Sequence, residues 1–328
     1  MLLLTDEELR QALPLPDVMR DAVDAVERAE RAEGEGRAAV FERTLLQFRP
    51  AEGRARSLVV NPAIVPDLDT AALKLFTQNV VHGPVPRERR THGVTALFDY
   101  QTMGLIAALE DGHLDVVRTG APSGVAVRHL ANPDAVDVAI IGSGELAPGQ
   151  LAAVCAVRPV TRVRVYSPTQ EHRDRFAAAM RAALEIEVTA CASARDAVDG
   201  AQVVVTVTNA FRPVIERSWL APGVTVISVA SGEIDAALVE DAVVFTSSVD
   251  RTLNDSKREP FATLMREGRI SPDRVCALSA VVAGRAAGRT NPDDIVLYVS
   301  TGRATWDVAV ATLAYQRCRA AGMGRSWP

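Results

Sequence analysis

The chain has 328 residues, 48% of them apolar and 23% charged, a composition typical of a globular protein large enough for two domains. Its formal net charge of −5 argues against nucleic-acid binding, because proteins that bind nucleic acid usually carry an excess of positive charge. We see no positively charged leader and no apolar run of membrane-spanning length, so we expect a soluble, cytoplasmic protein with no membrane partner.

The four cysteines and five histidines show none of the spacings typical of metal sites. Cys155, Cys191, Cys276 and Cys318 form no C-x-x-C pair, and no two histidines have H-x-x-x-H spacing. We therefore expect reduced, mostly buried thiols and no bound metal.

Lysine is nearly absent from the chain. Only Lys74 and Lys257 are lysines among the 36 basic residues. Arginine-rich codon usage accounts for the many arginines, but it does not account for a lysine inside the apolar segment "AALKLF". Lys74 is therefore a candidate functional residue.

The first part of the chain predicts helix followed by strands. From Thr5 to about Glu33 apolar residues recur at helical spacing, with a break at residues 14–16, and Thr5 with Glu8 forms a capping box. Between Val40 and Leu109, short apolar segments alternate with Gly, Pro and Asn, which indicates strands and turns. These strands are expected at residues 44–48, 56–60, 72–76, 94–98 and 104–109.

From Asp137 onward, strands alternate with amphipathic helices. The pattern predicts a doubly wound α/β domain of Rossmann type with a parallel sheet, beside a smaller α+β domain. Strands are expected at residues 137–142, 162–167, 202–208, 224–230, 242–247 and 294–302, and helices at 145–157, 171–184 and roughly 304–321. The segment 214–220, "VIERSWL", follows a turn in the place of a crossover helix.

The turn "GSGELA" after the first of these strands matches a dinucleotide fingerprint. Gly142 permits the tight turn, and Gly144 lets the backbone approach a pyrophosphate. The helix start at Glu145 and Leu146 supplies amide donors and a positive dipole. Ala147 allows close packing of the helix on the strand.

The end of the second parallel strand favours NADP(H), with NAD(H) as the alternative. An NAD enzyme usually places an acid here for the ribose 2′-hydroxyl. This chain has Ser167, Thr169 and Arg173 instead, and the first carboxylate is Glu171.

The chain resembles the ornithine cyclodeaminase/mu-crystallin family over nearly its whole length. The resemblance is carried by residues 72–86, 93–131, 138–153, 203–215 and 288–311. It implies a substrate-binding and dimerisation domain formed by residues 1–125 with 303–328, and a dinucleotide domain formed by residues 126–302. It also implies a homodimer that moves a hydride between a nicotinamide and the α-carbon of an amino acid or its imine.

The resemblance also implies the roles of individual residues. Lys74 and Arg118 match substrate-binding positions, and Arg43 matches a second carboxylate contact more loosely. Thr119 is expected at the start of a helix, where it donates to the pyrophosphate. The nicotinamide side is expected to involve Thr208, Asn209, Val229, Ser231, Ser300 and Gly302.

Structural alternatives remain for the substrate residues. Lys74 is alternatively an edge-strand cation that points to water, and Arg118 alternatively caps a helix C-terminus or pairs with Asp115. The segment "RTGAPSG" has Gly120 and Gly124 where the family usually has alanine. These glycines either open space near the carboxylate site or reflect different packing.

The chain departs from the family's cyclodeaminases after the fifth strand, where those enzymes have a catalytic aspartate. Here the loop is shorter, Glu233 is the candidate acid, and Asp235 is expected to cap the next helix. We therefore expect an NAD(P)H-dependent imine reductase or amino-acid dehydrogenase. The alternatives are a cyclodeaminase of ornithine- or lysine-like amino acids with bound NAD, and a non-enzymatic NADPH-binding protein.

Overall fold

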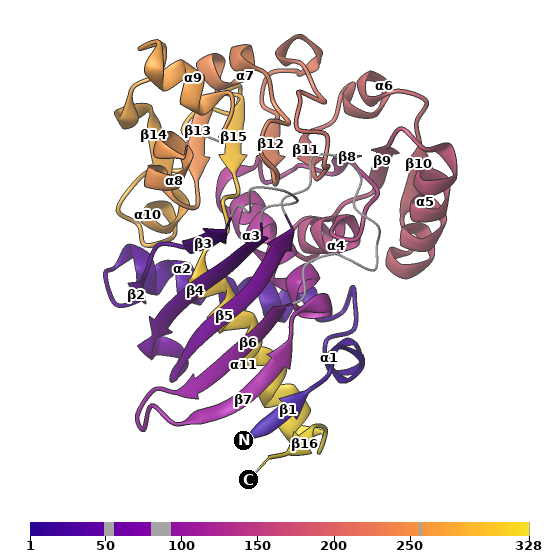
Figure 1. Cartoon of the computed structure of the whole chain (residues 1–328). Coiled ribbons are helices and arrows are strands. Elements are labelled where there is room, and N and C mark those ends of the chain that lie inside the picture. Colours follow the sequence, from indigo (N-terminus) through magenta and orange to yellow (C-terminus); the bar gives the residue numbers. More distant parts are fainter. Residues whose placement is uncertain (49–55, 80–92, 256–257, 328) are drawn as a thin grey trace. The chain divides into compact units, whose positions relative to one another are not determined.

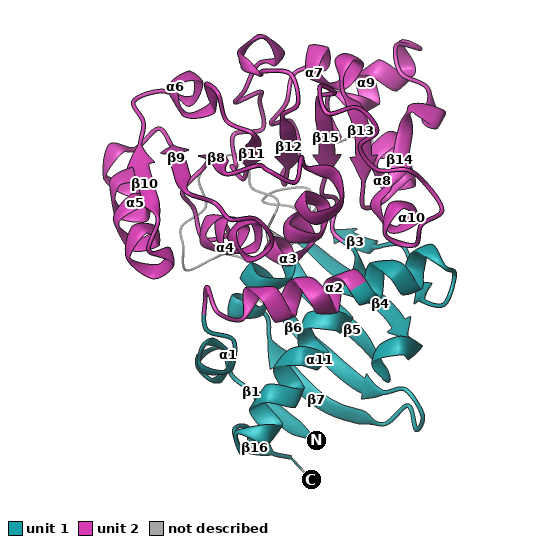
Figure 2. Ribbon diagram, turned by 180° about the vertical axis from the view of Figure 1, so that it is seen from behind, with its two compact units in different colours: residues 1–14, 28–118, 303–328 teal, residues 15–27, 119–302 magenta. Residues whose placement is uncertain are grey.

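The computed structural model of the chain describes residues 1–48, 56–79, 93–255 and 258–327 (Figure 1). The chain forms two compact units, which share the helices α2 (Met19–Gly34) and α3 (Gly112–Leu130) (Figure 2). Unit 1 consists of Met1–Pro14, Arg28–Arg118 and Arg303–Pro328, and unit 2 of Leu15–Glu27 and Thr119–Gly302. The boundary that the sequence predicted, between residues 125 and 126, lies in α3.

Unit 1 is built on a mixed eight-stranded sheet in the order β16-β1-β7-β6-β5-β4-β2, with β3 also paired to β4. All pairs are antiparallel except that of β1 with β7. The strands are β1 Leu2–Leu4, β2 Ala39–Val40, β3 Thr44–Phe48, β4 Arg56–Val65, β5 Thr70–Asn79, β6 Gly93–Asp99, β7 Leu105–Glu110 and β16 Arg325–Ser326. The other helices of this unit are α1 (Asp6–Ala12) and α11 (Ala304–Ala320).

The central strands of this sheet alternate between a buried and a half-exposed face. The buried side chains include Val59, Ala72 and Leu97, and α11 packs against β4, β5 and β6. The opposite face carries apolar side chains that are only half-buried, among them Leu58, Leu73 and Leu75. The sheet therefore has one covered face and one apolar, partly open face.

Unit 2 is built on an entirely parallel eight-stranded sheet in the order β10-β9-β8-β11-β12-β15-β13-β14. The strands are β8 Asp137–Ile141, β9 Arg162–Tyr166, β10 Glu187–Ala190, β11 Val203–Thr206, β12 Thr225–Ser228, β13 Val243–Thr246, β14 Val275–Ala277 and β15 Val296–Val299. Every residue of β11, β12 and β15 is buried, as expected for strands covered on both faces. The predicted α/β fold with a Rossmann-type sheet is confirmed.

The helices of unit 2 connect these strands. They are α4 Ala147–Val157, α5 Gln170–Leu184, α6 Ala194–Val198, α7 Ala236–Asp241, α8 Val249–Asn254, α9 Phe261–Arg266 and α10 Leu278–Val282. The predicted N-caps are confirmed: Thr5 and Glu8 form the capping box of α1, and Asp235 accepts a hydrogen bond from the amide of Leu238 at the start of α7. In the described part of the chain, no helix has the length and apolar character needed to cross a membrane.

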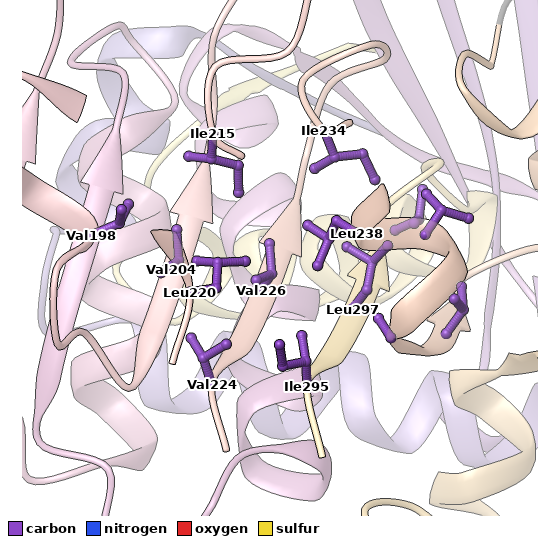
Figure 3. Packing of buried hydrophobic residues seen from close by; sticks show 14 of the residues in the cluster. Val198, Val204, Ile215, Leu220, Val224, Val226, Ile234, Leu238, Ile295 and Leu297 are labelled. Carbon is purple, nitrogen blue, oxygen red and sulfur yellow. The ribbon is translucent and has the colours of Figure 1, made fainter. Parts of the chain in front are cut away.

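The segment "VIERSWL" is not a crossover helix. It forms only a 3₁₀ turn, Arg217–Trp219, and otherwise runs as a loop between β11 and β12. Pro213 and Pro222 bracket the segment, and each proline restricts the backbone at its end of the segment. Ile215 and Leu220 nevertheless enter the core that unit 2 packs around Val204, Val226 and Leu297, shown in Figure 3.

A buried carboxylate anchors the start of α11 in unit 1. Glu30 of α2 is fully buried and accepts a 2.6 Å hydrogen bond from the indole nitrogen of Trp306, which is also fully buried. The second oxygen, Oε2, has no hydrogen-bond partner among the described residues. Burial, reinforced by the charge of Glu33, raises the pKa of Glu30 to about 8.

We predict that Glu30→Gln removes a pH dependence of stability. The folded state keeps a proton on Glu30 that the unfolded chain releases above its ordinary pKa of 4.5, so wild-type stability falls as the pH rises from 4.5 to about 8. Gln still accepts the hydrogen bond of Trp306 and never ionises. Urea unfolding at pH 6 and pH 9 should therefore show the variant gaining about 1 kcal/mol or more over wild type at the higher pH. The surface change Glu7→Gln is the control, and equal pH dependence in wild type and Glu30→Gln would contradict the assignment.

Candidate active site

The glycine turn after β8 has the backbone that a dinucleotide pyrophosphate requires. Gly142 has a φ of +113°, and a Cβ there would lie 2.3 Å from the carbonyl oxygen of Val207, so only glycine fits. At Gly144 a Cβ would meet no described atom within 4 Å beyond its chain neighbours, so the space is open. The strand order reverses between β8 and β11, and parallel sheets bind ligands at such a point.

Hydroxyl and guanidinium groups gather after β9. The hydroxyls of Ser143 and Ser167 lie 2.7 Å apart, which links the glycine turn to the end of β9. Arg173 donates to the carbonyl oxygen of Ser167 at 3.0 Å, and its guanidinium lies 5.8 Å from the centre of the Tyr166 ring. Thr169 is the N-cap residue of α5, but its hydroxyl takes no part in capping.

The predicted nicotinamide-side residues lie in the loops that follow three adjacent strands. The strands β11, β12 and β15 are neighbours, so their carboxyl ends share one edge of the sheet. The residues are Thr208, Asn209, Val229, Ser231, Ser300 and Gly302. Gly302 has a φ of +76°, which explains glycine at that position without reference to a ligand. Contact of these residues with a cofactor stays a prediction.

Glu233 is buried in a closed hydrogen-bond network of unit 2. Its carboxylate accepts from the Thr206 hydroxyl at 3.0 Å, from the Ala230 amide at 2.8 Å and from the Thr208 amide. The side chain thus ties the loop after β11 to the loop after β12. Burial raises the pKa of Glu233, although these hydrogen bonds oppose the shift.

Lys74 lies on the buried face of β5 in unit 1, and the whole residue is only 1% exposed. In the sheet register it pairs with Asn61 of β4 and Thr95 of β6, so these three side chains form a row across the buried face. β5 is an interior strand between β4 and β6. The alternative of an edge-strand cation that points to water is therefore wrong.

Three carboxylates surround the Lys74 ammonium group. Its Nζ atom lies 2.8 Å from Asp111 Oδ2, 2.8 Å from Asp115 Oδ1 and 3.5 Å from Asp307 Oδ1. Asp111 lies between β7 and α3, Asp115 in the first turn of α3, and Asp307 in the first turn of α11.

Arg118 shares these carboxylates. Its Nε donates to Asp115 Oδ1 at 2.8 Å and lies 3.3 Å from Asp307 Oδ1. Asp307 is fixed on its other side by Asn61, whose amide donates to Oδ2 at 2.9 Å. Of the two structural alternatives for Arg118, the pairing with Asp115 is observed. The helix C-cap is wrong, because α3 continues to Leu130.

We call Lys74, Asp111, Asp115, Arg118 and Asp307 the ion cluster. Burial raises the pKa of Asp111 to about 6, although Lys74 acts in the opposite direction. Burial and Arg118 act to lower the pKa of Lys74, but the three carboxylates outweigh them and raise it, so Lys74 is an ammonium ion at neutral pH. Burial also acts to raise the pKa of Asp115, but Arg118 and Lys74 hold it below its usual range.

The members of the ion cluster differ in exposure. The side chains of Lys74 and Asp307 are each 2% exposed, whereas those of Asp115 and Arg118 are 32% and 14% exposed. Arg43 lies near the cluster, because its guanidinium carbon is 5.3 Å from the centre of the Phe76 ring and Lys74 Nζ is 5.5 Å from the same centre. Asp115 and Arg118 are therefore more exposed than Lys74 and Asp307.

Thr119 lies within α3 and not at the start of a helix, as the sequence had led us to expect. The helix begins seven residues earlier, at Gly112, because "GHLDVV" continues the helical pattern backwards. The Thr119 hydroxyl is buried and has no hydrogen-bond partner among the described residues. Its contact with a pyrophosphate stays a prediction.

The two glycines of "RTGAPSG" serve close packing inside unit 2. A Cβ at Gly120 would lie 2.4 Å from the carbonyl oxygen of Gly149, and one at Gly124 would lie 2.5 Å from the side chain of Val23. The backbone of α3 therefore touches α4 directly. Of the two alternatives, different packing explains these glycines.

The sequence reasoning missed Asp111 and Asp307. A lysine inside a buried strand requires carboxylate partners, so the burial expected of "ALKLF" was a signal that such partners exist. No local pattern identifies them, because they lie 37 and 233 residues away from Lys74 along the chain. The four cysteines are free in the structure, but Cys318 alone is buried and the other three are half-buried, so the expectation of mostly buried thiols is wrong. Burial raises the pKa of Cys155 to about 12, which leaves it unreactive.

Comparison with known proteins shows similarity over the whole chain. The model of the ornithine cyclodeaminase/mu-crystallin family matches residues 9–322. A protein of Sinorhizobium fredii (strain NBRC 101917 / NGR234), named an uncharacterized cyclodeaminase, is 32% identical over 99% of this chain and 98% of its own. The Delta(1)-pyrroline-2-carboxylate reductase of Bacillus cereus (strain ZK / E33L) is 31% identical over 86% of this chain and 89% of its own.

A solved structure shows the same fold. The Thermococcus litoralis Delta(1)-pyrroline-2-carboxylate reductase, in complex with NADH and L-proline, matches with a TM-score of 0.88 and 29% identity, and the match covers 100% of both chains.

We predict that Gly144→Val abolishes dinucleotide binding without unfolding the protein. The new side chain meets no described protein atom, but it fills the space that a pyrophosphate needs. Fluorescence titration should show the affinity for NADPH and NADH reduced more than about tenfold, with the melting temperature unchanged. Gly142→Ala is the matched contrast: its Cβ clashes with Val207, so we expect a loss of about 1–3 kcal/mol of stability. Normal cofactor affinity in Gly144→Val would contradict the assignment.

Proposed function

The chain belongs to the ornithine cyclodeaminase/mu-crystallin family, and on this premise we propose that it is an NAD(P)H-dependent oxidoreductase. In this proposal it reduces an imine next to a carboxylate, or oxidises the corresponding amino acid. The observation that carries the proposal is the placement of Lys74 and Arg118 in one ion cluster, where Arg118 keeps a partly exposed side chain.

Arg118 is proposed to bind the substrate carboxylate. Its planar guanidinium can donate to both oxygens of a carboxylate. In the structure it already binds a carboxylate, since its Nε and Nη2 atoms both donate to Asp115 Oδ1. Lys74 stays charged at neutral pH, so it donates hydrogen bonds to the substrate and orients it. Arg43 is proposed as a second carboxylate contact beside the Phe76 ring.

Unit 2 is proposed to hold the nicotinamide cofactor, which supplies the hydride when bound. The residues present fit such a group: the backbone is open at Gly144, and the buried Thr119 hydroxyl has no partner among the described residues. The amides at Glu145 and Leu146, at the start of α4, favour a phosphate. The Thermococcus litoralis relative is described in complex with NADH, which supports this reading.

A cyclodeaminase activity is the second candidate, favoured by the name of the Sinorhizobium relative. That chemistry needs a base that takes a proton from the substrate amine. Glu233 already accepts hydrogen bonds at both carboxylate oxygens, and Asp235 caps α7. Both acids therefore already serve structural roles. This supports the reductase over the cyclodeaminase, which needs a base. The third candidate, an NADPH-binding protein without activity, predicts cofactor binding and no turnover.

We predict that the protein oxidises NADPH or NADH in the presence of Delta(1)-pyrroline-2-carboxylate, measured as loss of absorbance at the nicotinamide band. Ornithine and lysine with oxidised cofactor should release no ammonia. Arg118→Lys keeps the charge of the ion cluster but loses the planar fork, so kcat/KM should fall about tenfold or more, mainly through KM.

Two results would contradict the proposal. Redox-neutral ammonia release from ornithine or lysine, lost in Glu233→Gln, would establish the cyclodeaminase. Tight cofactor binding with no turnover of cyclic or acyclic imino acids would favour the non-enzymatic protein.

A preference for NADP(H) over NAD(H) is the finer part of the cofactor proposal. The nearest acid after β9 is Glu171, whose side chain is 82% exposed. Its Oε1 atom lies 3.8 Å from Arg175 Nη1. Ser167 and Arg173 line the turn instead, and both suit a 2′-phosphate.

We predict that NADPH binds more tightly than NADH in fluorescence titrations, and that Arg173→Ala weakens NADPH binding but leaves NADH binding nearly unchanged. Arg175→Ala, which removes an exposed arginine of the same helix, is the matched control. NADH binding that is about tenfold tighter than NADPH binding, a difference of roughly 1.4 kcal/mol, would rule out the preference.

A homodimer through the sheet of unit 1 is proposed from its open face. Leu58, Leu73 and Leu75 are only half-buried there, and Val94 is 38% exposed. A contiguous apolar sheet face of this kind usually marks a protein interface.

We predict that Leu75→Glu converts a dimer to a monomer in sedimentation or light-scattering measurements, because a charge is then buried in the apolar interface. Ala182→Glu, on the exposed side of α5, should leave the dimer intact. A Leu75→Glu variant that remains dimeric would place the interface elsewhere.

A further inference from the structure

The ion cluster contains one more acid than it has cations. Lys74 of β5 and Arg118 of α3 face Asp111 from the β7–α3 connection, Asp115 of α3 and Asp307 of α11. With all five groups ionised, the cluster itself carries a net charge of −1. The Arg43 guanidinium, outside the cluster, lies 5.3 Å from the centre of the Phe76 ring that Lys74 also approaches, and it is counted with the proposed substrate carboxylate as its second contact. The proposed substrate brings a further negative charge, its carboxylate, to the same place.

Asp111 is the member of the cluster best suited to hold a proton. Its Oδ2 atom contacts Lys74, whereas its buried Oδ1 atom has no hydrogen-bond partner among the described residues. Gly93 of β6 leaves the space that the carboxyl occupies, since a Cβ there would lie 2.8 Å from Oδ2. Burying an ionised carboxylate with one oxygen that has no hydrogen-bond partner costs much solvation free energy. Burying the protonated carboxyl costs much less. Burial acts in the same direction on the pKa of Asp111.

The carboxylate of a ligand therefore enters the ion cluster together with a positive charge. At effective protein dielectric constants, two like charges about 4 Å apart repel by several kcal/mol, so an uncompensated anion binds poorly. An amino acid or protonated imine brings its own positive nitrogen. A ligand with a carboxylate and no basic nitrogen brings none, and the protein itself has to supply the charge as a proton.

We propose that binding of a carboxylate ligand without a cationic nitrogen is coupled to uptake of one proton by Asp111, so that Asp111 acts as the counter-charge that a protonated imine otherwise provides. This inference rests on the proposed function, because it takes the ion cluster as the site of the substrate carboxylate. It assigns the site to zwitterionic or protonated ligands in preference to simple carboxylate anions.

The proton has a defined place in the proposed reduction. An uncharged imine that binds as an anion takes up one proton on Asp111. This proton passes to the imine nitrogen, which leaves Asp111 ionised, and the imine carbon would then accept the hydride from the reduced cofactor. The π-electron pair of the C=N bond moves to nitrogen, which keeps the proton, and the cofactor is oxidised by two electrons. Asp111 thus holds the proton that is later bound to the product nitrogen.

The test compares two ligands of similar shape with the reduced cofactor bound, so that neither can react. L-proline carries a positive nitrogen, and tetrahydro-2-furoate has a ring oxygen in its place. Titration calorimetry at pH 7.5 in two buffers of different ionisation enthalpy gives the number of protons taken up. We expect about one proton for tetrahydro-2-furoate and about none for L-proline. Between pH 7 and 9 the furoate affinity should fall about tenfold per pH unit, and the proline affinity should not.

Asp111→Asn is the decisive variant. It removes the titrating group at nearly constant shape, so furoate binding should become independent of pH and take up no proton. Asp99→Asn, at the end of β6 in the same unit, changes the net charge equally and should behave as wild type. If Asp111→Asn does not fold, the comparison of the two ligands on the wild type decides the question.

The outcomes separate this inference from the proposed function. Furoate binding without proton uptake in the wild type, or uptake that persists in Asp111→Asn, overturns the inference and leaves the proposed substrate class intact. If neither ligand binds to the cofactor-loaded protein, the inference and the proposed function are both overturned.

Discussion

A lysine enclosed on the buried face of a sheet constrains the rest of unit 1. An ammonium group removed from water is strongly destabilising unless charged partners surround it. Three carboxylates do so for Lys74, and they come from the β7–α3 connection, from α3 and from α11. Removing one charge from such a set usually lowers stability by about 3–5 kcal/mol, because the remaining charges stay buried. The cluster therefore joins the centre of the sheet to the last helix of the chain.

The position of α11 depends on a second set of buried contacts. Trp306 donates to Glu30, and Thr305 donates to Glu33 at 3.0 Å, so the first turn of α11 is held by α2. Asp307 follows directly in this turn, and its contacts with Lys74 and Arg118 depend on that anchoring. A change in the ionisation of Glu30 is thus expected to reach the ion cluster through one helical turn.

The sequence predicted the fold and the family well, because both rest on periodic patterns and local turns. The glycine turn at Gly142, the capping box of α1 and the alternation of strands and helices are local features of this kind. The segment 214–220 was misjudged, since two prolines outweigh its apolar spacing. The start of α3 was also misjudged, and with it the place of Thr119.

The chemistry of the candidate site was only partly predictable. Lys74 and Arg118 were found because of unusual residue usage and a family motif. Asp111 and Asp307 were not found, because their role arises from long-range packing of a charge. Likewise, nothing local to Glu233 indicated that both its carboxylate oxygens would be used by the two loops it connects.

The most direct test of this account is a crystal structure of the protein with reduced cofactor and L-proline. The account predicts that the proline carboxylate lies within hydrogen-bond distance of the Arg118 guanidinium and Lys74 Nζ, with Asp115 displaced from Arg118. A structure in which Asp115 keeps its contact with Arg118 and the proline carboxylate binds away from both cations would contradict it.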